Sequence, residues 1–376
     1  MTTLLLKNAN VVLPDEEVQR ASVLVVDGKI ASLDAAVADE EIDLTGATLL
    51  PGFIDVHIHG AVGVDVMDAS AAALGKVSAY LASQGVTSWV PTFVPASDEN
   101  YASAIAAISE AMPKDAGARV LGVHYEGPFV NTAQCGALHT EYFKTYSNAE
   151  DLSSLPLPES GVRMITLAPE VSGGIELIRE LRARGWVISI GHTRAGLDVL
   201  DAACDAGAHH MTHFMNAMAP LHHRSPGPIA WGLSRDDVTF DLIADGIHLH
   251  PFMLQLLVKM KGARGISLIS DAIAATGKGD GDYQIWGETI SVKDGRTANA
   301  SGNIAGSVIS MLDAFRLLRS LNISLVDLAR LSSTNPARLL GIDDLCGSIA
   351  VGKRADLVAL DPDSNVVLTL VNGKQI

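Results

Sequence analysis

Eight short apolar segments, separated by segments with helical periodicity, constrain the fold of this chain more than any other feature. Each has seven or eight residues, which is typical of a buried strand. Strands that alternate with helices predict a parallel sheet, and eight such units predict that the sheet closes. We therefore predict an α/β fold, a (β/α)8 TIM-like barrel. The predicted strands are 52–59, 87–93, 120–126, 163–169, 186–192, 209–215, 238–245 and 265–271.

Helical patterns fill most of the intervals between these strands and follow the last one. The predicted helices are 72–84, 100–112, 174–184, 197–206, 252–261, 308–320 and 325–340. The interval 217–236 is different, because it is rich in Pro and Gly. We predict a long loop there, and loops of that length in a compact domain are often functional.

The two ends of the chain carry a second pattern, rich in Val and Leu and interrupted by turn signals such as Pro14-Asp15 and Asp27-Gly28. Residues 4–33 and the last thirty residues both have it. We predict one small β-sandwich domain built from both termini. Its parts are residues 1–50 and 346–376, and the barrel occupies residues 51–345.

The charge balance limits the partners of this chain. Lys and Arg number 27 against 43 Asp and Glu, a net charge of −16. Such a protein is a poor candidate for binding nucleic acid or an anionic membrane. Three widely spaced cysteines do not suggest a disulfide framework, and neither a secretion signal nor an apolar run of membrane length is recognisable. We expect a cytoplasmic protein.

Side chains that can bind a metal ion or carry a proton end six of the eight predicted strands. They are His57, His59, Glu126, His192, His213, Asp245 with His248, and Asp271. Because the active site of such a barrel lies at the carboxyl ends of its strands, we expect these side chains at one rim.

The first strand ends on His57 and His59, one residue apart. Side chains alternate across a strand, so both imidazoles face the barrel mouth. Imidazoles with a carboxylate suit Zn, Fe or Mn, and Glu126 can bridge two ions. The alternative is a histidine pair that caps the strand through backbone hydrogen bonds. The other strand ends favour a metal site, which His192 and His213 would complete.

Asp271 ends the eighth strand and has two interpretations. A carboxylate beside a metal-activated water can take its proton and later give it to a leaving amine. Asp is also a good helix N-cap, and both interpretations predict a short loop. His209 and His210 precede the rim, so we expect them to pack or to support other groups.

Motifs along nearly the whole chain resemble a known family. "PGFIDVHIHG" and "GSIAVGKRADLVALD", near its two ends, resemble the amidohydrolase superfamily. Within it, the chain resembles the N-acetylglucosamine-6-phosphate deacetylases through "HYEGPF", "GHT", "THFMNAM", "ADGIH", "SDAIAATG", "AGSVISM" and "NPARLLG". The resemblance implies removal of the N-acetyl group from an amino-sugar 6-phosphate, giving the free amine and acetate.

The resemblance also implies roles for the metal-binding side chains. Glu126, His192 and His213 form the main metal site, and His57 and His59 add a second. It marks Asp271 as the general base and then the general acid, beside the metal ligands. We expect one or two divalent ions per subunit, with zinc favoured over iron, manganese or cobalt.

The same resemblance suggests which residues contact the substrate. Arg224 matches a phosphate-binding arginine, and a guanidinium group suits phosphate; a solvated loop arginine is the alternative. Asn216, Ala217 and His248 match other substrate positions. A small-molecule amino-sugar phosphate is thus the expected partner, and the resemblance suggests a homodimer.

One loop departs from the family pattern. The family places a carbonyl-polarising His or Gln directly after a Gly-Ala pair, but here Leu138 holds that place and His139 follows. We take His139 as the candidate substrate contact; a changed acyl or sugar preference is the alternative. Cys135, in the same loop, is expected to be an ordinary small residue.

Three other functions stay open at this point. A cyclic-amide or dipeptide hydrolase of the superfamily is disfavoured, because such enzymes often use a lysine on the fourth strand and 163–169 has none. A deacetylase for N-acetylgalactosamine 6-phosphate is the second. A non-catalytic barrel that binds a sugar phosphate is the third.

Overall fold

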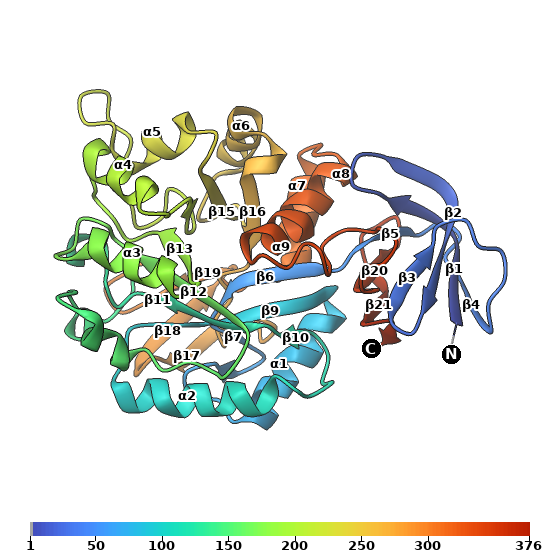
Figure 1. Cartoon of the computed structure of the whole chain (residues 1–376), viewed down its shortest axis with the longest axis horizontal. Helices are drawn as coiled ribbons and strands as arrows, with labels where there is room; N and C mark the ends of the chain where they lie inside the picture. Colours follow the sequence, from blue (N-terminus) through green and yellow to red (C-terminus); the bar gives the residue numbers. More distant parts are fainter. Residues whose placement is uncertain (1–2) are drawn as a thin grey trace.

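The computed structural model describes residues 3–376. It has two parts, a barrel surrounded by helices and a smaller sheet that contains strands from both ends of the chain (Figure 1). This confirms the predicted α/β architecture and the joint origin of the small domain. The boundaries at residues 50/51 and 345/346 stay predictions.

Eight parallel strands form the barrel, and each lies where the apolar pattern predicts it. In spatial order they are β6 (Phe53–Ile58), β9 (Val86–Phe93), β11 (Gly122–Glu126), β12 (Val162–Leu167), β13 (Val187–Ile190), β14 (His210–Met211), β15 (Thr239–Ile243) and β16 (Ile266–Ile269). A two-residue strand, β10 (Arg119–Val120), also pairs with β9. Hydrogen bonds just beyond β16 close the barrel: Asp271 N donates to His57 O (2.9 Å) and His59 N to Ala272 O (2.8 Å).

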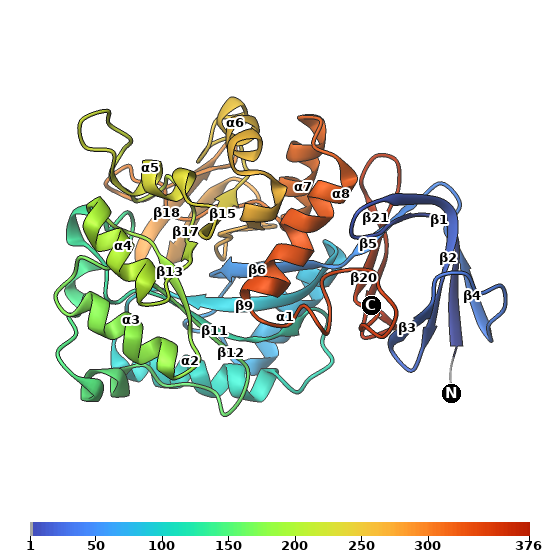
Figure 2. The ribbon, with the colours of Figure 1, turned by 45° about the horizontal axis from the view of Figure 1, so that its top comes forward.

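Helices cover the outside of the barrel at the predicted places. They are α1 (Ala71–Ser83), α2 (Asp98–Ala111), α3 (Gly174–Ala183), α4 (Leu197–Asp205), α6 (Pro251–Lys261), α7 (Met311–Ser320), α8 (Leu325–Ala329) and α9 (Asn335–Leu339). A π-helical segment, Arg330–Thr334, joins α8 to α9, so that 325–339 is continuous. In two views, α7 and α8 lie on the side of the barrel that faces the terminal sheet (Figures 1 and 2).

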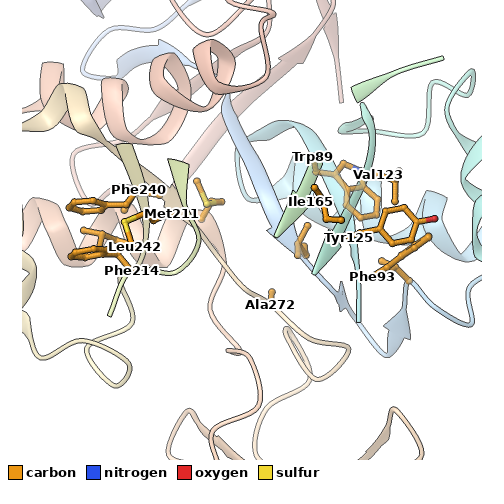
Figure 3. Packing of buried hydrophobic residues seen from close by; sticks show 14 of the residues in the cluster. Trp89, Phe93, Val123, Tyr125, Ile165, Met211, Phe214, Phe240, Leu242 and Ala272 are labelled. Carbon is orange, nitrogen blue, oxygen red and sulfur yellow. The ribbon is translucent and has the colours of Figure 1, made fainter. Parts of the chain in front are cut away.

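Aromatic side chains on the strands or just beyond them fill the space under these helices. Phe214 stacks on Phe240 with ring centroids 4.1 Å apart, and Tyr125 packs edge-on against Phe93 at 5.3 Å. Figure 3 shows the two groups on different parts of the barrel wall. All four are fully buried, and such burial contributes roughly 2 kcal/mol per large apolar side chain. This packing holds the strands, and hence their carboxyl ends, in place.

The terminal sheet runs β22-β21-β20-β5-β1-β2-β3, with β4 beside β1. Its strands are β1 (Thr3–Val12), β2 (Glu17–Val26), β3 (Lys29–Ser32), β4 (Glu40–Asp43), β5 (Thr48–Pro51), β20 (Leu357–Leu360), β21 (Val366–Val371) and β22 (Lys374–Gln375). Backbone hydrogen bonds from Ile30 N to Lys353 O and from Ala355 N to Gly28 O, both 2.8 Å, bring its two arms together. The sheet thereby encloses a core of its own.

Two local predictions are wrong, and one alternative interpretation is excluded. The segment 217–236 is not all loop, because Gly227–Ser234 forms helix α5 with Pro in its first turn, a position that proline favours. Asp271 does not cap a helix: its φ is 51°, and the next helix, α7, is capped by Ser310. The loop after Asp271 is also long rather than short.

That long loop contains a small antiparallel sheet. Its strands are β17 (Gly281–Ile285), β18 (Glu288–Lys293) and β19 (Arg296–Ala298). A second short hairpin, β7 (Gly60–Ala61) with β8 (Val64–Asp65), follows the first barrel strand.

Among residues 3–376, no helix combines the length and the apolar character needed to cross a membrane. The three cysteines, Cys135, Cys204 and Cys346, are free thiols.

Candidate active site

The barrel brings six of the predicted residues into one buried cluster at the carboxyl ends of its strands. Five of them are no more than 4% exposed and the sixth, Asp271, is 6% exposed. They are His57, His59, Glu126, His192, His213 and Asp271. The cluster contains two groups of three, each with its ligand atoms within 4.8 Å of one another.

The first group consists of His57, His59 and Asp271. The Nε2 atoms of the two histidines lie 3.2 Å apart. Asp271 Oδ1 is 3.4 Å from His57 Nε2 and 3.2 Å from His59 Nε2. The three atoms therefore form a nearly equilateral triangle, as ligands around one ion do.

The second group consists of Glu126, His192 and His213. Glu126 Oε1 lies 2.9 Å from His192 Nε2 and 3.0 Å from His213 Nε2, and the two nitrogens are 3.2 Å apart. The other carboxylate oxygen of Glu126, Oε2, lies 3.4 Å from His59 Nε2. Glu126 thus faces both groups, as a bridging carboxylate does.

These distances fit divalent metal ions. Ligands about 2.0–2.1 Å from a tetrahedral ion lie about 3.3–3.4 Å from one another. The separations within the two groups, 2.9–3.4 Å, approach that edge length. Four imidazole nitrogens with two carboxylates form a ligand set that Zn, Fe, Mn or Co can use.

The electrostatics of the cluster also favour positive charge. Burial raises the pKa of Glu126, but the surrounding histidines His57, His192 and His213 outweigh it and hold the pKa well below the usual value. Burial lowers the pKa of His59, but Asp271 and Glu126 outweigh it and raise the pKa to about 9. Glu126 is therefore kept ionised, and His59 keeps a proton that a divalent ion would displace on binding.

Contacts of the second ring nitrogen, Nδ1, orient two of the histidines. His59 Nδ1 lies 3.0 Å from the Thr92 carbonyl oxygen, and His192 Nδ1 lies 2.7 Å from that of Gln134. When Nδ1 donates to a carbonyl, Nε2 is left as the free lone pair, the arrangement seen in most metal-binding histidines. Both contacts direct Nε2 into the cluster.

The backbone is strained at this site. His192, His213, Ala217 and Asp271 have φ between 31° and 51°, a region that residues other than glycine seldom adopt. Such strain persists only where the surrounding structure imposes it, and it gathers at functional sites. Three of these four residues, His192, His213 and Asp271, belong to the two ligand groups.

A cavity of about 370 Å³ opens above the cluster. The predicted substrate residues Asn216, Ala217 and His248 line it, together with Asp271. His248 Nδ1 lies 2.7 Å from Asp245 Oδ2. Burial raises the pKa of Asp245, but its hydrogen bonds and the charge of His248 outweigh it and lower the pKa overall. Asp245 therefore fixes the His248 ring at the cavity wall.

Two predicted substrate residues do not line this cavity. Arg224 is exposed in the loop before α5, where its Nη1 atom lies 2.7 Å from His223 Nε2. His139 lines a neighbouring cavity and contacts Glu141 at 3.2 Å, whereas Leu138 lines the cavity over the cluster. The backbone turn at His139, which precedes the 3-10 helix Thr140–Tyr142, directs the two side chains differently.

An aromatic residue that lines the cavity was not predicted from the sequence as a site residue. Trp286, in the turn between β17 and β18, lines the cavity, and its ring packs edge-on against His59 with centroids 5.2 Å apart. Two short segments in which apolar and polar residues alternate, joined by Trp286-Gly287, were the available signal, because a hairpin of this kind shows as short strands around a two-residue turn.

Comparison with known proteins places the chain in a family. Residues 48–376 match the amidohydrolase family. The N-acetylglucosamine-6-phosphate deacetylase of Bacillus subtilis is 39% identical, over 99% of this chain and 96% of that protein. The N-acetylgalactosamine-6-phosphate deacetylase of Escherichia coli O157:H7 is 36% identical, over 93% of each.

A solved structure is similar over the whole length. It is a mutant N-acetyl-D-glucosamine-6-phosphate deacetylase from Mycobacterium smegmatis in complex with N-acetyl-D-glucosamine-6-phosphate, with a TM-score of 0.91 and 31% identity. The match covers 100% of this chain and 99% of that one. With this similarity and the match to the family, the chain belongs to the amidohydrolase family.

Proposed function

We propose that this protein hydrolyses N-acetylglucosamine 6-phosphate to glucosamine 6-phosphate and acetate. The observation that carries the proposal is the pair of adjacent ligand groups, with Glu126 of one group also facing His59 of the other and Asp271 lining the same cavity. The similarity to deacetylases over nearly the full chain supports this substrate class.

The two groups of ligands would hold one or two divalent ions. Glu126, His192 and His213 would bind one, and His57, His59 and Asp271 would bind a second, with Glu126 between them. A bound divalent ion supplies Lewis acidity, which polarises the amide carbonyl and lowers the pKa of a water. Zinc is our first choice because it accepts these ligands in tetrahedral geometry, and iron, manganese and cobalt are alternatives.

Asp271 is the proposed proton carrier. Its carboxylate accepts a proton from the attacking water as the water oxygen bonds to the carbonyl carbon. Asp271 then donates this proton to the amide nitrogen, the C–N bond breaks, and acetate and the free amine leave. One side chain serves as base and then acid because it stays within reach of both the water and the leaving nitrogen.

The sugar would lie against the wall formed by Asn216, Ala217 and His248, on the side of β14 and β15. His248 is held by Asp245 and is suited to contact a sugar hydroxyl or the phosphate. Arg224 is proposed to bind the phosphate, although it lies outside the cavity of its own chain. A partner subunit that supplies Arg224 would explain this, and we accordingly propose a homodimer.

His139 remains a proposed substrate contact only if its loop moves on binding, because its side chain lies in the neighbouring cavity. The cytoplasmic location likewise stays a prediction.

N-acetylgalactosamine 6-phosphate is a second candidate substrate, favoured by the similarity to the E. coli enzyme named for it. The two sugars differ only at the fourth carbon.

A panel of substrates tests the proposal. Purified protein, reconstituted with Zn²⁺, is given N-acetylglucosamine 6-phosphate, N-acetylgalactosamine 6-phosphate and unphosphorylated N-acetylglucosamine. We expect the largest kcat/KM with the first and the smallest with the last. Equal turnover of the phosphorylated and the unphosphorylated sugar would reject the proposed substrate, and a preference for the galacto sugar would select the second candidate.

A further inference from the structure

Trp286 is the residue that this inference concerns. It is the first of two residues, Trp286 and Gly287, that join β17 to β18. Both have positive φ, 54° and 78°. This is a type I′ turn, in which Asn, Asp or Gly usually fills the first position. A bulky residue in the left-handed region is an outlier, and such strain points to a function for the side chain.

The side chain is fixed in position by its neighbours. Its ring packs edge-on against His59 with the centroids 5.2 Å apart. Its indole N–H is buried without a hydrogen-bond partner among residues 3–376, and the side chain packs, partly buried, against the barrel core. The ring is therefore a rigid wall beside the metal ligands rather than a mobile surface group.

This wall separates two cavities. On one side is the 370 Å³ cavity over the ligand cluster, and on the other is a cavity of about 340 Å³. Among the described residues 3–376, Trp286 is the one residue that lines both. The second cavity has an apolar section formed by Met67, Val94, Pro95 and Ala96. Removing the indole would join the two spaces.

The proposed orientation of the substrate puts the acyl group against this wall. If the sugar lies against Asn216, Ala217 and His248, the amide crosses the cluster beside Asp271. The acyl chain then points away from the sugar, toward the end of the cavity that Trp286 forms next to His59. An acetyl methyl can fit before the ring, and a longer chain would meet it.

We propose that Trp286 sets the length of the acyl group that the enzyme accepts, by closing the passage from the catalytic cavity into the apolar section of the neighbouring cavity. The inference rests on the proposed deacetylase function. It assigns to Trp286 a role in specificity and none in the proton transfers.

The test compares N-acetyl-, N-propionyl- and N-butyrylglucosamine 6-phosphate as substrates of the wild type, Trp286→Ala and Trp286→Phe. Gln284→Ala is the matched control, because Gln284 is exposed on the same hairpin and bonds to Thr289. We expect Trp286→Ala to raise the butyryl-to-acetyl ratio of kcat/KM by at least about tenfold, since hydrophobic pockets discriminate single methylenes by 10-fold or more. Trp286→Phe should raise it less, and Gln284→Ala should leave it unchanged.

A ratio within about threefold of the wild type in both Trp286 variants, with normal metal content, would overturn the inference. If Trp286→Ala does not fold or loses metal, the test uses Trp286→Phe and measures substrate binding by calorimetry in the inactive Asp271→Asn variant. Adding Trp286→Phe to that variant must strengthen the binding of the butyryl substrate relative to the acetyl substrate. An unchanged ratio of the two dissociation constants rejects the inference. Failure of the wild type to cleave the acetyl substrate would reject the proposed function itself and this inference with it.

Discussion

The backbone N–H of Asp271 donates a hydrogen bond of 2.9 Å to the carbonyl oxygen of His57. Together with the bond from His59 N to Ala272 O, this contact joins the last barrel strand to the first. It also places Oδ1 of the Asp271 carboxylate 3.4 Å from Nε2 of the His57 imidazole. The closure of the barrel and the assembly of the site are therefore one structural event.

Replacing Asp271 by Asn should separate its two possible roles. The amide keeps the size of the side chain but cannot accept and return a proton, so we expect kcat to fall by roughly 10³-fold. Because four histidines and Glu126 remain, metal content should stay near the wild-type value. Acetate release and metal analysis on the same sample check this, and a loss of metal would show that Asp271 is chiefly a ligand.

The paired His57→Asn and His59→Asn substitutions should lower the metal content by one ion per subunit. They remove two of the three ligands of the first group and leave Glu126, His192 and His213 in place. His250→Asn is the control, since His250 is exposed and belongs to none of the groups that could hold a metal ion among the described residues. Elemental analysis after dialysis provides the count. An unchanged count would mean that the first group does not hold an ion.

Arg224→Ala should raise KM for N-acetylglucosamine 6-phosphate by at least about tenfold, because charge-assisted hydrogen bonds to phosphate contribute roughly 1.5–3 kcal/mol. KM for the unphosphorylated sugar should change little. Arg179→Ala, at an exposed arginine on α3, controls for net charge. An equal rise in KM for both sugars would remove Arg224 from the phosphate site.

His124 should make the fold sensitive to acid. Burial, only partly offset by the hydrogen bond with Val56 O, lowers its pKa to about 4, against an ordinary value of 6.5. The neutral imidazole is thus favoured on folding, so its contribution is complete above pH 6.5 and is lost as the pH falls from 6.5 toward 4. A shift of this size corresponds to on the order of 3 kcal/mol.

The free energy of unfolding of metal-free wild type and His124→Asn, measured by urea at pH 8 and pH 5, checks this. The wild type should lose more stability between the two pH values than the variant does. Removing metal first excludes its release in acid as the cause. Parallel pH dependence of the two proteins would show that His124 is not the group responsible.

The sequence predicted the barrel well because strands buried on both faces are continuous apolar runs, which are easy to recognise. It also predicted which residues converge, because the carboxyl ends of parallel strands meet at one rim: His57 on β6 and His213 beyond β14 come together from distant parts of the chain. Both inferences depend on local pattern and on topology, which sequence carries.

Loops were predicted less well, since their shape depends on contacts with other segments. The turn at His139 sends Leu138 into the catalytic cavity and His139 into its neighbour, and no periodicity signals this. The insertion β17–β19 was missed, and Trp286 with it, because short strands around one turn resemble an ordinary loop. Asp271 is of a residue type that often caps helices, yet it caps none here.

Acetate release measured against bound metal tests the central claim most directly. Metal-free protein is titrated with Zn²⁺ in the presence of N-acetylglucosamine 6-phosphate, and acetate and free amine are both quantified. We predict no turnover without metal, and equal amounts of acetate and amine that rise with the first one or two equivalents per subunit. No acetate at any loading with Zn²⁺, Fe²⁺, Mn²⁺ or Co²⁺ would contradict the account.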